Sequence, residues 1–193
     1  MKKCLMLLVV IVLLSPAAKA QPPVGYIGLF TDASRTSWCA YGTTPYYPVT
    51  MYIWCLPSVN GQMCAEFAID YTADPGIIKT SATQAPHVSV ALGGLDSGMS
   101  VCFTECQTAW HWVFTQALFI NTSSKLTLQI IPNPVVEPVP LYQFANCLPK
   151  FPTEPCIVFT NLYINSRNGI DAECSTTATE TASWGAIKNI YQD

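Results

Sequence analysis

The sequence predicts an all-β protein: an immunoglobulin-like or jelly-roll-type β-sandwich of about nine strands, stapled by disulfides. Three observations predict it: short runs rich in β-branched and aromatic residues, turn-forming Gly, Pro, Asn and Asp between the runs, and an even number of cysteines behind an export signal. The expected strands cover Val24–Phe30, Val49–Leu56, Met63–Tyr71, Ile77–Ala82, His87–Leu92, Met99–Thr104, Trp110–Asn121, Lys125–Ile131 and Ile157–Asn165. Short strands at this spacing are typical of a sandwich.

Two of these runs show the two-residue period of a strand that is buried on one face. The apolar members are Leu126, Leu128 and Ile130 in one run and Val88, Val90 and Leu92 in the other. Only the segment 182–191 has a helical period, with Trp184, Ile187 and Tyr191 at positions i, i+3 and i+7. We expect this segment to form a short C-terminal helix that docks on the sandwich as a clasp.

Residues 1–20 have the features of a cleavable secretory signal peptide. A positive start, an apolar run over residues 4–14 and the cleavage site Ala18-Lys19-Ala20 follow one another. The apolar run is too short for a bilayer, which takes about 20 residues, and no later stretch is both long and uniformly apolar, so no membrane span is expected. The mature chain, residues 21–193, is expected to be a single domain that is secreted, periplasmic or displayed at the cell surface.

Cleavage would make the chain more acidic. The full sequence has 9 basic and 12 acidic residues. Because Lys2, Lys3 and Lys19 would leave with the signal peptide, six basic residues would remain against twelve acidic ones, a net charge of −6. Few scattered basic residues argue against nucleic acid or an anionic membrane as a partner. No cofactor is expected.

The mature chain keeps eight cysteines, and an even number after an export signal predicts disulfides. Cys55 and Cys64 flank the turn signal Asn60-Gly61, so we expect a bridge across this hairpin. Cys147 and Cys156 bracket a proline-rich loop that a second bridge would close. The pairing stays open for Cys39, Cys102, Cys106 and Cys174. Because no Cys-x-x-Cys occurs, neither a metal site nor a thioredoxin-type centre is expected.

Aromatic residues give the main candidates for ligand binding. Trp110, Trp112 and Phe114 share one face of an expected strand, and His111 lies between the two tryptophans. Exposed aromatic rings stack on sugars or anchor a protein partner, whereas buried ones belong to the core. We therefore take Trp110, Trp112 and His111 as candidate ligand-binding residues, with core packing of the stripe as the alternative.

Candidate catalytic groups are few and have no motif around them. His87 and His111 occur without a Gly-x-Ser-x-Gly sequence, and both are expected at the surface or its rim. Glu66 and Asp70 project from one face of a strand roughly 13 Å apart, farther than the two carboxylates of a glycosidase. The sequence therefore predicts no catalytic residue.

Four segments stand out: Ala65-Glu66-Phe67, Gly98-Met99-Ser100-Val101 running into Cys106-Gln107, Phe144-Ala145-Asn146-Cys147, and Ser183-Trp184-Gly185-Ala186-Ile187-Lys188, the last a Ser/Thr-Trp-Gly-x-Ile-Lys segment near the C-terminus. Together they resemble a group of uncharacterised secreted bacterial proteins. The strand pattern also resembles, loosely, cohesin-type and other immunoglobulin-like modules of bacterial surface proteins. This resemblance implies a β-sandwich and transfers no active site.

Three functions are weighed. The first is a secreted non-catalytic module, structural or adhesive, that binds a protein. The second is a carbohydrate-binding module, which predicts Trp110 and Trp112 exposed in a groove, with an extracellular polysaccharide as ligand. The third is a secreted glycoside or ester hydrolase, which predicts that two or more of Glu66, Asp70, Asp96, His87 and His111 converge within hydrogen-bond reach of one pocket. An edge strand such as Val24–Phe30 could also pair with another subunit.

Overall fold

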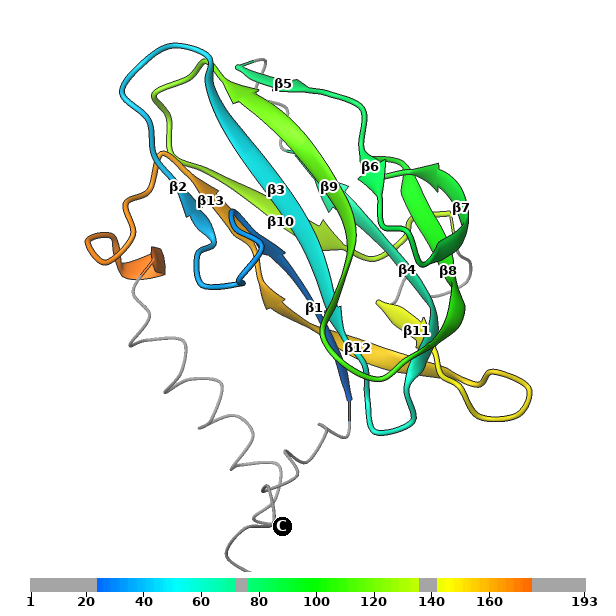
Figure 1. Cartoon of the computed structure of the whole chain (residues 1–193). Helices are drawn as coiled ribbons and strands as arrows, with labels where there is room; N and C mark the ends of the chain where they lie inside the picture. Colours follow the sequence, from blue (N-terminus) through cyan, green and yellow to red (C-terminus); the bar gives the residue numbers. More distant parts are fainter. Residues whose placement is uncertain (1–23, 72–75, 136–141, 175–193) are drawn as a thin grey trace, which may run out of the picture.

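The computed structural model describes residues 24–71, 76–135 and 142–174, and these form two packed layers of β-strands (Figure 1). The first layer contains β1 (Gly25–Phe30), β3 (Tyr47–Leu56) and β9 (His111–Ile120). Along the edge of β9 that does not pair with β3, two short strands are added, β5 (Ile77–Lys79) and β6 (Thr83–Gln84). The second contains β4 (Gln62–Asp70), β7 (Val88–Gly94), β8 (Gly98–Gln107), β10 (Leu126–Ile131), β11 (Gln143–Ala145), β13 (Leu162–Ile164) and β2 (Cys39–Ala40). Strand β12 (Thr153–Thr160) pairs with both β1 and β11 and so joins the two layers.

The predicted all-β sandwich is confirmed, with 13 strands in the described residues in place of about nine. The additional strands are short. Segments of two or three residues, such as β2, β6 and β11, carry too little alternation to be recognised in the sequence. The expected strand Ile157–Asn165 is divided at Asn161 into the end of β12 and the separate β13.

The core lies between the layers and is built by alternate residues of the long strands. On β3 the buried inward residues are Val49, Met51, Ile53 and Cys55. On β10, Leu128 and Ile130 are buried as their alternation predicted, while Leu126 is half-buried at the strand's start. The two-residue period therefore located the core face of β10 correctly.

Strand β7 departs from its predicted alternation. Val88 is buried, but Val90 and Leu92 are 47% and 64% exposed. The register between β7 and β8 shifts between Val88 and Val90. An extra residue in one strand turns every later side chain to the opposite face, so the bulge explains why Val90 and Leu92 face solvent.

Strand β1 is not an edge strand, so the expectation of subunit pairing through Val24–Phe30 is wrong. It pairs in parallel with β12 on one side and antiparallel with β3 on the other. Among the described strands, β7 pairs only with β8 and therefore has one free edge.

The described residues contain three disulfides: Cys39–Cys174, Cys64–Cys102 and Cys106–Cys147. Both predicted bridges are wrong, for Cys55–Cys64 and for Cys147–Cys156. Strands β3 and β4 do not pair as a hairpin, since the turn at Asn60-Gly61 carries the chain from one layer to the other. Cys64 instead lies directly opposite Cys102 on β8, with a Cα–Cα distance of 4.0 Å.

The predicted Cys147–Cys156 bridge is wrong because the two cysteines are not opposite each other in the hairpin. Strands β11 and β12 do form the expected hairpin, and Ala145 pairs with Thr153. Continuing that register, Cys147 lies about five residues along the ladder from Cys156, roughly 16 Å, while bridged α-carbons lie within about 7 Å. Cys147 reaches Cys106 at the end of β8 instead.

Cys55 and Cys156 are free thiols, and both are buried. They lie on strands that flank β1, two strand spacings apart and two residues out of register, which separates them by roughly 12 Å, too far to be bridged. Burial raises the pKa of the Cys55 thiol to about 12 and raises that of Cys156 as well.

We expect the native protein to resist iodoacetamide, because the thiolate is the reactive form. Denaturation of the mature chain, residues 21–193, without reductant should then add two labels, which peptide mass spectrometry would place on Cys55 and Cys156. A label on any of the six bridged cysteines would contradict the disulfide pattern.

The expected signal peptide and the expected C-terminal helix lie outside the described residues. Within the described part of the chain, no helix is long and apolar enough to cross a membrane.

Candidate functional site

A cluster of aromatic side chains covers the outer side of strands β12, β1, β3 and β9, and we call it the aromatic face. Its members are Tyr26, Phe30, Tyr52, Trp54, Trp110, Trp112 and Phe159. The strand period places them there, because residues opposite each other on neighbouring strands share a face. Phe30 lies opposite Tyr52, and Trp54 lies opposite Trp112. This layer is therefore apolar on both sides.

The rings of the aromatic face are packed against one another. Phe30 stacks on Phe159 at a centroid distance of 6.1 Å and meets Trp110 edge-on at 6.2 Å. Trp110 in turn meets Phe159 edge-on at 5.8 Å. Phe30 and Trp54 are buried, whereas Trp110, Trp112 and Phe159 are half-buried. The inner rings thus hold the partly exposed rings in fixed positions, available to a partner.

Arg35 adds a cation to this face. Its guanidinium carbon lies 4.4 Å from the ring centroid of Trp54 and 5.4 Å from that of Trp110. Both distances are within the range of cation–π attraction. Arg35 also has a φ of 62°, in the left-handed region that non-glycine residues seldom adopt. Strained residues of this kind cluster at functional sites.

Asp32 fixes the loop that carries Arg35. Its carboxylate accepts hydrogen bonds from the Ser34 hydroxyl at 2.7 Å and from the Thr36 amide and hydroxyl, each at 3.1 Å. Partial burial alone would raise the pKa of Asp32, but these hydrogen bonds hold it below its usual value. The loop is also closed at its base, where the Thr31 amide donates to the Ser37 carbonyl.

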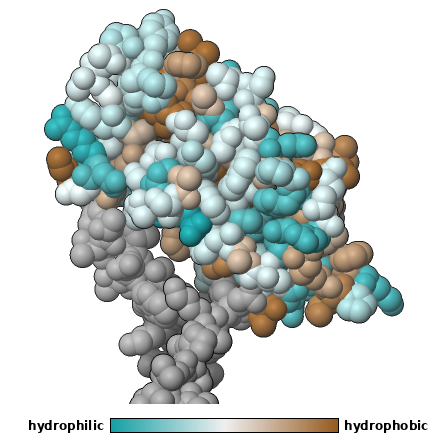
Figure 2. All heavy atoms as spheres, in the orientation of Figure 1, coloured by the Kyte–Doolittle hydropathy of each residue, from teal (hydrophilic) through white to brown (hydrophobic). Residues whose placement is uncertain are grey.

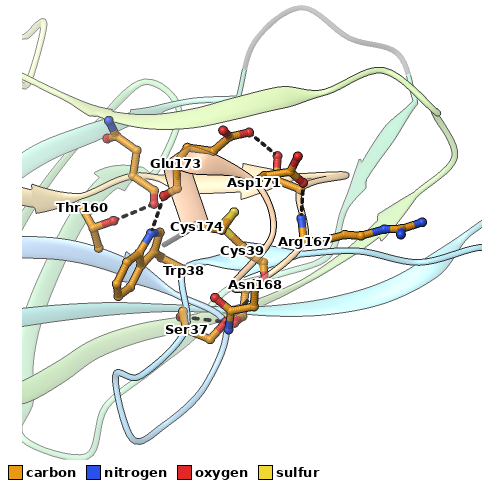
Figure 3. Close-up of a disulfide and its surroundings, with 12 residues drawn as sticks. Ser37, Trp38, Cys39, Thr160, Arg167, Asn168, Asp171, Glu173 and Cys174 are labelled. Carbon is orange, nitrogen blue, oxygen red and sulfur yellow. Dashed lines mark hydrogen bonds between the residues drawn. A yellow bond between two sulfur atoms is a disulfide. The ribbon is translucent and has the colours of Figure 1, made fainter. Parts of the chain in front are cut away.

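A disulfide fixes the neighbouring segment, which packs in the same hydrophobic cluster as Phe30 and Trp54 (Figure 3). Cys39 is bonded to Cys174 in the short helix η1 (Ala172–Cys174). Beside this bond the buried Trp38 indole donates to the Glu173 carbonyl at 2.9 Å, and the Asn168 amide donates to the Ser37 hydroxyl at 3.0 Å. The Arg35 loop and the segment ending at Cys174 are therefore held together next to the aromatic face.

The structure separates the residues that the sequence analysis grouped. Trp110 and Trp112 belong to the aromatic face, but Phe114 is 4% exposed and points into the core. A register shift opposite Ile53 and Trp54 causes this reversal, so the prediction of one shared stripe is wrong. His111 is also inside, 7% exposed, and therefore does not belong with the two tryptophans.

Arg35 and the five aromatic residues of this face other than Trp110 and Trp112 were not predicted as site residues. Arg35 lies in a short polar loop and belongs to no motif, so the sequence gives no sign that it reaches an aromatic ring. Trp54 lies in a predicted strand beside buried neighbours, and only the strand pairing shows that it faces outward with Trp112.

The groups considered for hydrolysis do not gather at one pocket. Glu66 lies on the outer side of β4 and accepts a hydrogen bond from Ser100. Asp96 forms an ion pair with Lys79 at 2.8 Å at the surface. His87 is half-buried and His111 is buried, and their ring centroids are 5.2 Å apart. A catalytic set that joins these acids to the histidines is therefore not formed.

A shallow groove of about 550 Å³ opens between the β5–β6 segment and the turn after β7. Tyr71 donates a hydrogen bond to Gln116 at 2.5 Å, and Gln116 donates to the Thr80 carbonyl at 2.6 Å. The Lys79 ammonium lies 4.4 Å from the centroid of the Tyr71 ring. These polar groups are engaged with one another, so the groove offers less to a ligand than the aromatic face.

Figure 2 shows hydrophobic residues in separate small groups among polar ones on the side that it displays. The candidate site is therefore defined by its side-chain contacts and not by one broad apolar patch.

Taken together, the described residues define a disulfide-bonded β-sandwich with an aromatic outer face. Comparison with solved structures places this fold among cohesin modules. The sixth cohesin of Acetivibrio cellulolyticus scaffoldin B, solved with a Cel5 dockerin mutant, has a TM-score of 0.51 at 15% identity and matches 75% of this chain and 99% of its own. A type III cohesin of the Ruminococcus flavefaciens ScaE scaffoldin has a TM-score of 0.52 at 12% identity and matches 80% of this chain and 93% of its own.

A further cohesin, CaCohA2 in complex with CaDoc0917, has a TM-score of 0.52 at 10% identity and matches 75% of this chain and all of its own. No protein-family model matches the sequence, and no curated protein matches it significantly. At these identities the likeness shows a cohesin-like fold and nothing about the ligand.

Proposed function

We propose that this chain is an exported, non-catalytic module that binds a protein partner through the aromatic face. Export is supported by the signal-like sequence of residues 1–20 and by three disulfides in the described residues. Disulfides of this kind form in oxidising compartments.

The observation that carries the proposal is the contact of Arg35 with Trp54 and Trp110. Tryptophan, tyrosine and arginine dominate the residues that contribute most to protein–protein binding. They contribute most when they are held in place before the partner arrives, since less conformational freedom is then lost on binding. The ring packing and the Asp32 hydrogen bonds provide this preorganisation.

The fold comparison supports a protein partner. Two of the similar structures are complexes of a cohesin with a dockerin, which is itself a protein module. For this chain we infer only that the partner is a protein, because the sandwich is shared and the sequence identity is low.

Carbohydrate binding is the second candidate, because Trp110 and Trp112 are half-buried and thus neither enclosed in the core nor fully exposed. Partly exposed tryptophans also stack on sugar rings. Affinity electrophoresis in gels containing soluble cellulose, xylan or chitin derivatives would test it. Retardation that is lost in Trp110→Ala would favour a sugar ligand over a protein.

For the protein partner, the wild-type module and the Arg35→Ala/Trp110→Ala variant would be immobilised and exposed to the secreted proteins of the source culture. A candidate retained only by the wild type would then be purified and its affinity measured directly. Loss of residues of this type weakens binding by roughly 30-fold or more, and we expect a loss of this size.

A matched control is Leu92→Ser, which changes an exposed apolar residue on the other layer. It should leave the affinity unchanged. Equal loss of affinity in both variants, or loss only in Leu92→Ser, would move the site away from the aromatic face. Circular dichroism would establish that each variant is folded.

A further inference from the structure

The two histidines of this chain pack against each other, with His111 buried and His87 half-buried. His87 precedes β7, and His111 is the first residue of β9. Their ring centroids are 5.2 Å apart with an interplanar angle of 75°, and both rings contact Phe103. The chain has only 2 histidines, so this contact brings together every imidazole that it possesses.

Both rings have an unused nitrogen that points into the protein. The Nε2 atoms of His87 and His111 are buried and have no hydrogen-bond partner in the described structure. His111 Nδ1 lies 3.1 Å from the Ala109 carbonyl oxygen, which can only accept a hydrogen bond. Nδ1 therefore carries the proton, and Nε2 carries a free electron pair. Metal-bound histidines have this arrangement, with the second nitrogen donating to a carbonyl or carboxylate.

A buried polar side chain on β4 is linked to His111 through Cys55. Gln62 is wholly buried, and its side-chain amide interacts with the Cys55 thiol. Cys55 is directly opposite His111 in the pairing of β3 with β9. Buried polar atoms are nearly always satisfied by protein, water or an ion, so the unpartnered Nε2 atoms of two neighbouring histidines indicate that something binds there.

We propose that His87 and His111 together bind one divalent transition-metal ion, Cu²⁺ most tightly and Zn²⁺ more weakly. Imidazole nitrogen suits both ions, and copper stands above zinc in the order of affinities for such ligands. This site is separate from the aromatic face, and the proposal does not depend on the proposed function.

The ring geometry agrees with a shared ion. Metal–nitrogen bonds to histidine are about 2.0 to 2.1 Å long, and two rings bound at a tetrahedral angle have centroids about 5 Å apart. The observed separation is 5.2 Å. The negative charge of Glu105 acts on His87 and would partly offset the charge of the ion.

The donor set is small, which limits the affinity. Among the described residues, no three or more His, Cys, Asp or Glu side chains are grouped as metal ligands. Water would complete the coordination, and His87, which is half-buried, leaves a path to solvent. We therefore expect an exchangeable ion and not a structural zinc of the closed, four-ligand type.

The test uses the full mature chain without a histidine tag, so that its own two imidazoles are the only ones present. After removal of metals by chelation, Cu²⁺ and Zn²⁺ are titrated separately and followed by native mass spectrometry and calorimetry. The Zn²⁺ titration is needed because Zn²⁺, unlike Cu²⁺, does not oxidise the free thiols of Cys55 and Cys156. We expect one ion per chain, with copper at least tenfold tighter, and nitrogen hyperfine structure in the electron paramagnetic resonance spectrum of the copper form.

His87→Gln is the decisive variant, because His87 is only half-buried and its replacement should leave the fold intact. It should weaken the binding of both ions at least tenfold, and His111→Gln should do the same. Glu66→Gln, on the outer side of β4, is the control and should bind normally. Full binding by a folded His87→Gln chain, or no stoichiometric ion in the wild type, would overturn the proposal in favour of an ordered water at this position.

Discussion

Replacing Cys39 and Cys174 together by alanine is expected to lower the free energy of unfolding by about 4 kcal/mol. This bridge closes a sequence separation of 135 residues, the longest of the three. A crosslink over a longer loop removes more freedom from the unfolded chain. The bridge is also buried beside Trp38, so its loss leaves a poorly packed region. Urea unfolding at neutral pH would measure the change.

The matched control is the double variant Cys64→Ala/Cys102→Ala. Its bridge spans 38 residues and joins directly opposed residues of β4 and β8. The loop-entropy relation gives a loss about 1 kcal/mol smaller than for the longer bridge. Equal stability of the wild type and the Cys39→Ala/Cys174→Ala variant would show that hydrogen bonds such as Trp38 to Glu173 hold this segment without the disulfide.

The Cys39→Ala/Cys174→Ala variant should also affect the proposed binding surface. The segment from Ser37 to Cys39 follows the Arg35 loop directly, and Asn168 donates a hydrogen bond to Ser37. Loosening the segment should increase the motion of Arg35 over Trp54. Partner affinity should therefore fall even under conditions in which the variant remains folded.

The fold class could be predicted because the long strands are buried on one face. On β10 the two-residue period located the buried Leu128 and Ile130 correctly. The same rule failed on β7 and β9, where the register shifts beside Val90 and opposite Trp54. A bulge is set by strand pairing, so alternation within a single strand cannot reveal it.

The disulfides and the histidine pair could not be predicted for a related reason. Asn60-Gly61 does form a turn, but the turn connects two layers and not two paired strands, so the cysteines on either side of it face different neighbours. His87 and His111 meet because β7 pairs with β8 in one layer while β9 follows in the other layer, and both rings pack on Phe103 of β8. Both results depend on contacts between strands, which have no signature in the local sequence.

The turn at Asn60-Gly61 leads to the last expected result: Glu154→Ala should destabilise the protein by about 3 kcal/mol. The Glu154 carboxylate accepts hydrogen bonds of 2.6 Å each from the Ser58 hydroxyl and from the Asn60 and Asn146 side-chain amides. Ser58 and Asn146 are buried. Removing their acceptor would leave buried donors unsatisfied, which costs more than the hydrogen bonds themselves contribute.

Glu154 also makes this stabilisation dependent on pH. Partial burial would raise the pKa of its carboxyl group, but the hydrogen bonds from Ser58, Asn60 and Asn146 hold it below the ordinary value of 4.5. A carboxylate with a lowered pKa in the folded state stabilises the protein fully above its unfolded pKa, and this contribution is lost as the pH falls through the folded value. The gap in unfolding free energy between wild type and Glu154→Gln, measured in urea from pH 7 down to pH 3, should therefore shrink at the acid end. A gap that stays constant over this range would mean that the charge of Glu154 contributes nothing and that shape alone holds the turn between the two layers.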